Sequence, residues 1–162
     1  DLAFGGAGDD RFLADSWTNS AGTRLDGADT FYGGPGIDTV TYAVRPERVV
    51  VTLDGQANDG APGEGDDIRP DVENITGGFG DDSLIGNASN NVLDGGPGYD
   101  SLTGLGGDDT LHGVDGSGGN DRLDGGDGTD ACFADAGDTL ARCEVLNLPP
   151  IVRPSPFVLG RG

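Results

Sequence analysis

Acidic side chains recur every nine residues along much of this chain, each within a glycine-rich segment. Between residues 77 and 103 the recurring positions are Asp82, Asn91 and Asp100. Calcium takes about six to eight oxygen ligands in a tolerant geometry, and glycine allows a turn to aim its backbone carbonyl groups inward. The chain has 25 Asp and only 4 Glu, which favours the side chain short enough to reach an ion held by its own turn. The spacing therefore predicts a series of calcium sites.

The predicted calcium ligands share the sixth position of the repeat. Counting alternate repeats puts them on two edges of the fold, so that Asp82, Asp100 and Asp121 stack on one edge. Asn91, Asp109 and Asp130 stack on the other. The alternative is that these side chains only form Asx-type turns without a metal. The full set of candidate ligands is Asp10, Asp29, Asp38, Asp82, Asn91, Asp100, Asp109, Asp121 and Asp130.

Some positions near this set depart from it. Asn91 carries no charge, and Ser89 stands in its repeat where a glycine belongs, so we expect a weak site there or none. Glu73 occupies the aspartate position with one more methylene group, and the sequence leaves its ligation open. The acidic residues at the fifth position are expected to face solvent; these are Asp9, Asp81 and Asp108.

An apolar residue follows each candidate ligand two positions later. A nine-residue unit cannot fold alone, so it must stack on its neighbours as a solenoid. Ten inward side chains, each contributing roughly 1.5–3 kcal/mol, cannot offset the ordering of so many glycines at ~1–2 kcal/mol per residue. Calcium binding must then supply folding free energy. The predicted inward residues are Phe12, Phe31, Val40, Ile75, Leu84, Leu93, Leu102, Leu111, Leu123 and Cys132.

The repeats divide the chain into blocks. Residues 1–146 form the predicted roll, with repeat blocks 1–41 and 73–133 and a surface excursion over 14–26. An insertion over 42–72 contains a longer strand, 48–53, with Val49, Val51 and Leu53 on one face. Residues 134–146 depart from the repeat and are expected to cap the roll, since an open end would expose strand edges. Residues 147–162 form a proline-rich tail, expected to be extended.

The repeat pattern resembles the hemolysin-type calcium-binding repeat of the RTX (repeats-in-toxin) family. The copies that match it fully include GGFGDDSLI (77–85), GGPGYDSLT (95–103) and GGDGTDACF (125–133). The resemblance implies an all-β, right-handed parallel β-roll in which six residues make a turn and three make a strand. It also implies that several calcium ions lie between turns stacked on one edge, with turn carbonyls completing each shell.

Composition and motifs argue against several function classes. The net charge is −20 and all nine basic residues are arginine, so nucleic-acid binding is not expected. No stretch is long and apolar enough to span a membrane. The only histidine, His112, falls at an outward position, which argues against a zinc site. No nucleophile–base or metalloprotease motif is present, so we expect no enzymatic activity.

The two cysteines are eleven residues apart, with Cys132 at an inward position and Cys143 in the cap. An even count in a chain with secreted character predicts a disulfide, which would pin the cap to the last coil. Two buried free thiols are the alternative.

The sequence favours a secreted, extracellular bacterial protein that binds calcium and folds outside the cell, as the RTX resemblance implies. One alternative is a structural protein that assembles end to end into fibres through the roll ends and the tail. Another is the calcium-binding part of a larger secreted hydrolase or toxin.

Overall fold

The computed structural model describes residues 2–14, 27–116 and 120–147. Within these ranges the regular elements are all strands, and no helix occurs. The predicted excursion and the proline-rich tail lie largely outside the described residues. The strands are β1 (Leu2–Phe4), β2 (Arg11–Leu13), β3 (Thr30–Tyr32), β4 (Thr39–Thr41), β5 (Val50–Thr52), β6 (Asp67–Ile68), β7 (Asn74–Thr76), β8 (Ser83–Ile85), β9 (Val92–Asp94), β10 (Ser101–Gly106), β11 (Thr110–Gly113), β12 (Arg122–Asp127), β13 (Ala131–Ala134), β14 (Thr139–Ala141) and β15 (Val145–Asn147).

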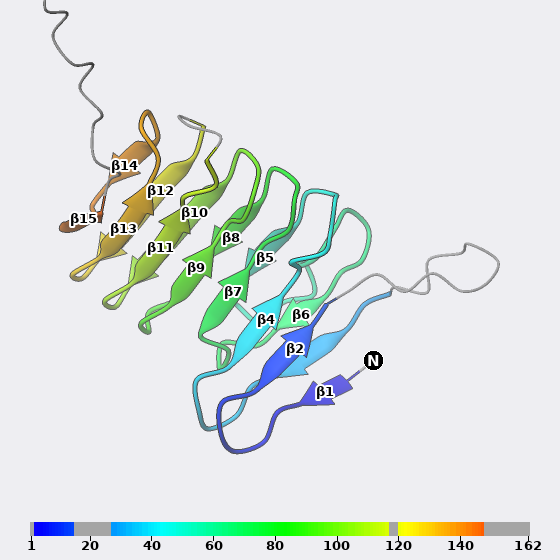
Figure 1. Ribbon diagram of the computed structural model, residues 1–162. Coiled ribbons are helices and arrows are strands. Elements are labelled where there is room, and N and C mark those ends of the chain that lie inside the picture. The colour runs from blue at the N-terminus through cyan, green and yellow to red at the C-terminus, as the bar shows by residue number, and fades with distance from the viewer. Residues whose placement is uncertain (1, 15–26, 117–119, 148–162) are drawn as a thin grey trace, which may run out of the picture.

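Successive strands alternate between two walls of a parallel β-roll, except that β5 and β6 lie on the same wall (Figure 1). One wall is a seven-stranded sheet in the order β15-β13-β11-β9-β7-β4-β2. The opposite wall consists of a five-stranded sheet, β14-β12-β10-β8-β5, and a three-stranded sheet, β1-β3-β6. Every pair of named strands is parallel, and each strand pairs with the equivalent strand of the next coil. The predicted parallel β-roll is confirmed.

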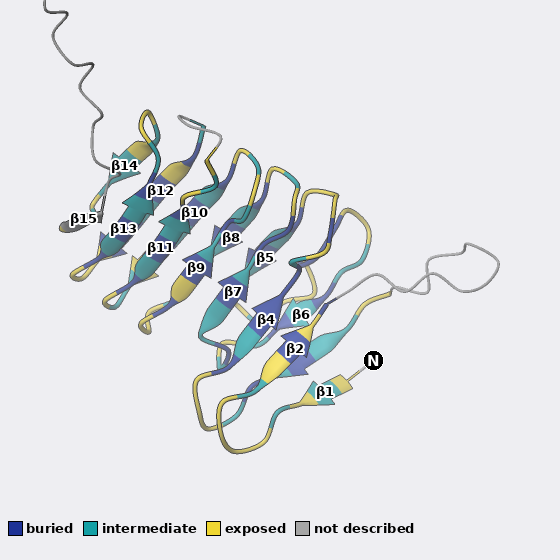
Figure 2. Ribbon diagram, in the orientation of Figure 1, coloured by how far each residue is buried: buried dark blue, intermediate teal, exposed yellow. Residues whose placement is uncertain are grey.

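The nine-residue period places one apolar side chain of each strand inside the roll. Leu84, Leu102 and Leu123 align directly across β8, β10 and β12, and all three are fully buried. All ten predicted inward residues are buried, as are Val49, Val51 and Leu53. The longer strand predicted over 48–53 is wrong in its length, because β5 covers only Val50–Thr52. Figure 2 shows this interior as the buried positions at the centre of the strands, with exposed residues at the turns.

The insertion over 42–72 interrupts the wall that carries β3 and β8. Between those two strands lie β6, then the segment 59–60, then β5. The segment is joined to its neighbours by antiparallel bridges, Asp59 to Asp66 and Gly60 to Val50. On the opposite wall β7 alone separates β4 from β9. The insertion thus adds rungs to one wall only.

Residues 134–146 lose the glycine frame but continue both walls. Strand β14 pairs with β12, and β15 pairs with β13. Cys132 and Cys143 form a disulfide with a Cα–Cα distance of 5.9 Å, so the predicted pairing is confirmed. The last coil is therefore held by two sheets and one covalent bond.

Candidate metal sites in the stacked turns

The sixth-position carboxylates form a hydrogen-bonded ladder along each edge of the roll. On one edge, the Asp82 N–H donates to Asp100 Oδ1 at 2.7 Å, and the Asp100 N–H donates to Asp121 Oδ1 at 2.8 Å. Each carboxylate thus reaches back to the backbone of the coil before it. Oxygen Oδ1 is used in holding the turns together, which leaves Oδ2 for another partner.

The opposite edge has the same ladder. The Asn91 N–H donates to Asp109 Oδ1 at 2.7 Å, and the Asp109 N–H donates to Asp130 Oδ1 at 2.8 Å. Nearer the N-terminus, the Asp10 N–H donates to Asp38 Oδ1 at 2.8 Å. The structure therefore contains the two stacks that the sequence predicted from alternate repeats.

The second oxygen of most ladder carboxylates is buried and receives no hydrogen bond from the described residues. Burying a charged oxygen without a partner is costly, and a cation facing it would remove that cost. Burial, the largest cause, raises the pKa of Asp100 to about 7 and those of Asp109 and Asp121 to about 6. The carboxylates with an unpartnered Oδ2 are Asp10, Asp38, Asp100, Asp109, Asp121 and Asp130.

The turns that carry most of these oxygens share a backbone conformation, which we call the open turn. In turn 95–100, Gly96 and Gly98 have φ of 80° and 155°, a region that L side chains rarely enter. A Cβ at Gly96 would lie 2.5 Å from the carbonyl oxygen of Gly78 in the preceding stacked turn. The carbonyl of one turn therefore faces the next turn closely. Positive φ at the second and fourth positions also occurs in turns 5–10, 33–38, 104–109 and 125–130.

Turn 104–109 reaches the open conformation without a glycine at its second position. Leu105 occupies that position with φ of 79°, which costs a non-glycine residue roughly 1–2 kcal/mol. Its side chain is half exposed, so core packing does not account for this conformation. The backbone is joined to the stacked turns on both sides, since Leu105 pairs with Gly126 and the Gly106 N–H donates to the Asn87 carbonyl at 3.1 Å.

Turns 77–82 and 86–91 have a different conformation, which we call the closed turn. Their second and fourth residues do not have positive φ. The Gly78 N–H donates to Asp82 Oδ2 at 2.6 Å, and the Asn87 N–H donates to Asn91 Oδ1 at 2.8 Å. Asp82 Oδ1 in turn accepts from the Val49 N–H at 2.7 Å. The side-chain oxygen that has no donor among the described residues in the open turns is thus bonded to the protein here.

A family comparison agrees with this geometry. The RTX calcium-binding nonapeptide repeat matches residues 1–16, 25–41, 70–102, 85–117 and 103–140, which together cover more than half of the chain. The chain belongs to the RTX repeat family. It is therefore a calcium-binding β-roll. A comparison with curated proteins gave no match.

The open turns of this RTX roll fit calcium in a particular way. The described residues contain no group of three or more His, Cys, Asp or Glu side chains that could hold a metal. Each open turn instead offers one carboxylate oxygen beside closely approaching carbonyl groups. Calcium accepts carbonyl oxygens as ligands, so backbone groups would supply most of each shell. The residues that would hold the ions are those with an unpartnered Oδ2.

The remaining candidate positions take part in the ladder in other ways. The Asp29 N–H donates to Asp66 Oδ1 at 3.0 Å, and most of the turn before Asp29 lies outside the described residues. Glu73 Oε2 accepts from the Asp38 N–H at 2.8 Å, so its longer side chain fills the aspartate position of the ladder. Glu144 does the same for the Asp130 N–H at 2.8 Å.

The fifth-position residues form an outer ladder at the surface. Asp81 Oδ1 accepts from the Tyr99 N–H at 3.0 Å, and Asp108 Oδ1 accepts from the Thr129 N–H at 2.9 Å. Asp9 does the same for the Ile37 N–H. These three aspartates are exposed, as predicted, and they join neighbouring coils while remaining in water.

Sequence reasoning missed three members of the ladder, Asp66, Asp138 and Glu144. Asp138 Oδ1 accepts from the Asp121 N–H at 3.2 Å, and Leu140 follows it two residues later, aligned with Leu123. The order of acid, spacer and apolar residue survives there although the glycines are lost. That order was the available signal for Asp138.

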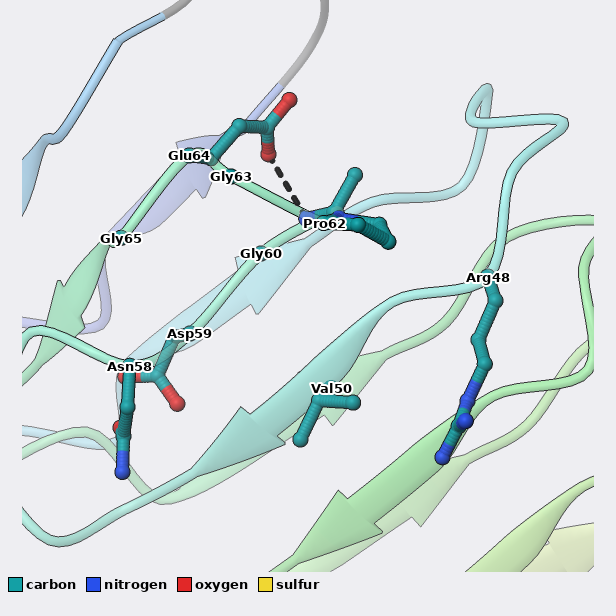
Figure 3. Close-up of a pocket in the computed structure, with 10 residues that line it drawn as sticks. Arg48, Val50, Asn58, Asp59, Gly60, Pro62, Gly63, Glu64 and Gly65 are labelled. Carbon is teal, nitrogen blue, oxygen red and sulfur yellow. Dashed lines mark hydrogen bonds between the residues drawn. The ribbon is translucent and has the colours of Figure 1, made fainter.

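The described surface also contains a pocket of about 360 Å³ beside the insertion (Figure 3). Arg48 and Val50 line one side, and the loop 58–65 lines the other. Its acidic side chains are bonded within the protein. Asp59 accepts from the N–H groups of Thr52 and Ile68, and Glu64 pairs with Arg45. Burial raises the pKa of Asp59 to about 7.

Proposed function

We propose that this chain is a secreted, non-enzymatic RTX protein whose roll folds when it meets extracellular calcium. The observation that carries the proposal is the set of six buried carboxylate oxygens, along the two edges of the roll, that receive no hydrogen bond from the described residues. In calcium-free surroundings these oxygens disfavour the folded state, because each is removed from water without compensation. A bound cation reverses that balance. Metal binding and folding are then one event.

The charge of the chain strengthens this coupling. With a net charge of −20, stacking acidic turns beside one another is opposed by mutual repulsion. When bound, calcium supplies positive charge and a shared centre for carbonyl and carboxylate ligands. The residues of this chain supply the rest, since Oδ1 fixes each carboxylate to the preceding coil and so aims Oδ2. The turn glycines allow the backbones of stacked turns to approach one another closely.

Secretion is supported by the disulfide and by the repeat family. A disulfide persists in oxidising surroundings outside the cytosol, and Cys132–Cys143 closes one within the last coil. Calcium at extracellular concentrations would occupy sites that stay empty in a calcium-poor cytoplasm. The repeats that carry these sites would accordingly remain unfolded before export and fold afterwards.

Circular dichroism with and without a calcium chelator tests the proposal. We expect most of the β signal to be lost in excess chelator and to return with calcium, whereas magnesium should restore little because it demands a small octahedral shell. Metal analysis must confirm that the chelated sample is free of calcium. An unchanged β spectrum in that sample would refute calcium-coupled folding.

End-to-end assembly is a second candidate, favoured by one observation. Among the described residues, strands β1 and β2 each pair on one side only, and Leu2, Phe4 and Leu13 near these edges are more than 60% exposed. Unpaired edges are sites where another chain can add strands. Light scattering in calcium over a range of concentrations tests this, and a monomer at the highest concentration would exclude it.

A further inference from the structure

The middle of the roll is joined by contacts that differ from those of the open turns. Turn 42–49, which precedes β5, contains no aspartate and stacks on closed turn 77–82. The Phe79 N–H donates to the Arg45 carbonyl at 2.7 Å, and the Val49 N–H donates to Asp82 Oδ1 at 2.7 Å. Gly78 lies so close to Arg45 that a Cβ there would be 2.4 Å from its carbonyl oxygen. Protein groups therefore make the turn-to-turn contacts here.

Neutral amides cross the corresponding junction on the other edge. Asn87 Nδ2 donates to the Pro70 carbonyl at 3.1 Å, and Asn91 Nδ2 donates to the Glu73 carbonyl at 2.9 Å. An amide nitrogen is a donor and cannot be a calcium ligand. Side-chain amides thus bond these two carbonyl groups, whereas in the open turns a calcium ion would be needed to contact the carbonyl groups. Closed turn 86–91 does not fit calcium.

The insertion supplies further internal bonds to the same region. The carboxylate of Asp59 bridges β5 and β6, because its two oxygens accept from Thr52 N–H at 2.7 Å and Ile68 N–H at 2.9 Å. The Tyr42 hydroxyl donates to Asp66 Oδ2 at 3.0 Å. Arg45, fully buried, pairs with Glu64. The buried carboxylates of Asp59 and Asp66 therefore have protein donors on both oxygens.

The apolar core is also denser in this segment than in the repeats that follow. Inward side chains elsewhere come about once per repeat, whereas the insertion alone, residues 42–72, contributes seven buried apolar residues. The buried apolar residues between 42 and 94 are each at most 5% exposed, and they are Tyr42, Val49, Val51, Leu53, Ala61, Ile68, Val72, Ile75, Leu84 and Leu93.

We propose that residues 42–94 form a calcium-independent nucleus, on which the flanking repeat blocks fold only when calcium binds. The two closed turns mark its C-terminal side, and the insertion fills its interior. The flanks carry the open turns, whose unpartnered oxygens require an ion. The inference rests on the proposed calcium-coupled folding of those flanks, and it predicts that the chain without calcium is a partly folded protein and not a uniform coil.

Hydrogen exchange of the full chain in excess chelator, read by mass spectrometry, tests this directly. We expect peptides within 47–54 and 83–94 to exchange at least about a hundredfold more slowly than unfolded peptides. Peptides within 101–113 and 122–134 should exchange freely until calcium is added. Protection absent everywhere in chelator but complete in calcium would overturn the nucleus and leave calcium-coupled folding standing. Protection everywhere in chelator would overturn both.

A matched pair of variants tests the role of the closed turn. Asn91→Asp puts a carboxylate where the amide now bonds the Glu73 carbonyl, so protection of 86–94 should become dependent on calcium. Asn90→Asp makes the same change at the neighbouring exposed residue, whose Oδ1 accepts from the Asp108 N–H, and should leave the wild-type pattern unchanged. Identical exchange in the two variants would overturn the argument from the closed turn.

Discussion

Replacing Asp100 by asparagine should make the roll less dependent on calcium, by converting an open position into one like Asn91. Asp100 Oδ1 accepts from the Asp82 N–H, and an amide oxygen can keep that bond. Its buried Oδ2 has no donor in the described protein. We therefore expect two opposite effects of Asp100→Asn: loss of bound calcium, and more structure in chelator than the wild type shows.

The size of the second effect follows from the pKa of Asp100, which burial raises to about 7. An unfolded chain has an aspartate pKa near ~3.9, and a difference of about 3 units corresponds to about 4 kcal/mol. Because the folded pKa is the higher one, the fold loses stability as the pH rises from about 4 to about 7, and the full cost applies above that. Asparagine removes this cost at pH 8, so about 4 kcal/mol is the upper bound of the gain without calcium.

Asp81→Asn is the matched control, because it removes the same charge one coil away. Asp81 is exposed, and its Oδ1 accepts from the Tyr99 N–H at 3.0 Å, which an amide can also do. Circular dichroism at pH 8 in chelator, with calcium content measured after dialysis against calcium, gives both readouts. If Asp100→Asn leaves the circular dichroism signal and the calcium content unchanged, or if Asp81→Asn changes them by the same amounts, the unpartnered oxygen is not a calcium ligand.

Other expectations concern the cap, the turns and pH. Cys143→Ser should reduce the free energy of unfolding in calcium by about 3 kcal/mol, measured by denaturant titration; an unchanged midpoint would mean that the disulfide does not secure the last coil. Gly96→Ala should cost at least ~1–2 kcal/mol, since φ is 80° and a neighbouring carbonyl would lie 2.5 Å from the new Cβ. Gly106→Ala, with its nearest neighbouring atom at 3.7 Å, should lie within about 0.5 kcal/mol of wild type in the same thermal assay, and equal losses would contradict the open-turn geometry. In chelator, β structure should increase as the pH falls from about 8 to about 5, because Asp109 and Asp121, with pKa values of about 6, become neutral and their raised pKa then favours the fold; a signal that falls on acidification would refute this.

The repeat spacing was sufficient to predict the roll, its inward residues and the two carboxylate stacks. Period nine is a property of each unit, and units such as 95–103 carry both the ligand and the core residue. The spacing could not distinguish open from closed turns. Gly78 and Gly80 have the same residue type as Gly96 and Gly98, yet only the second pair has positive φ.

The difference comes from what each turn stacks on. Turn 95–100 lies on a glycine turn, whereas turn 77–82 lies on 42–49, which is more than 30 residues earlier and has Arg45 at the point of contact. Tertiary context therefore decides the conformation of turns that have glycine at the same positions. At the C-terminus, Asp138 and Glu144 were missed because the glycines that identify a repeat are absent, although both side chains join the ladder.

The unequal walls at the insertion affect the direction of the whole roll. From β3 to β8 one wall crosses two more rungs than the other does from β4 to β9, which at about 4.8 Å per rung is about 10 Å. A roll with walls of unequal length cannot keep a straight axis and two flat walls at once. Calcium would stiffen the repeat blocks on either side of the insertion without removing the bend between them. The direction of the N-terminal repeat block is then set by residues 54–65, and not by the ions.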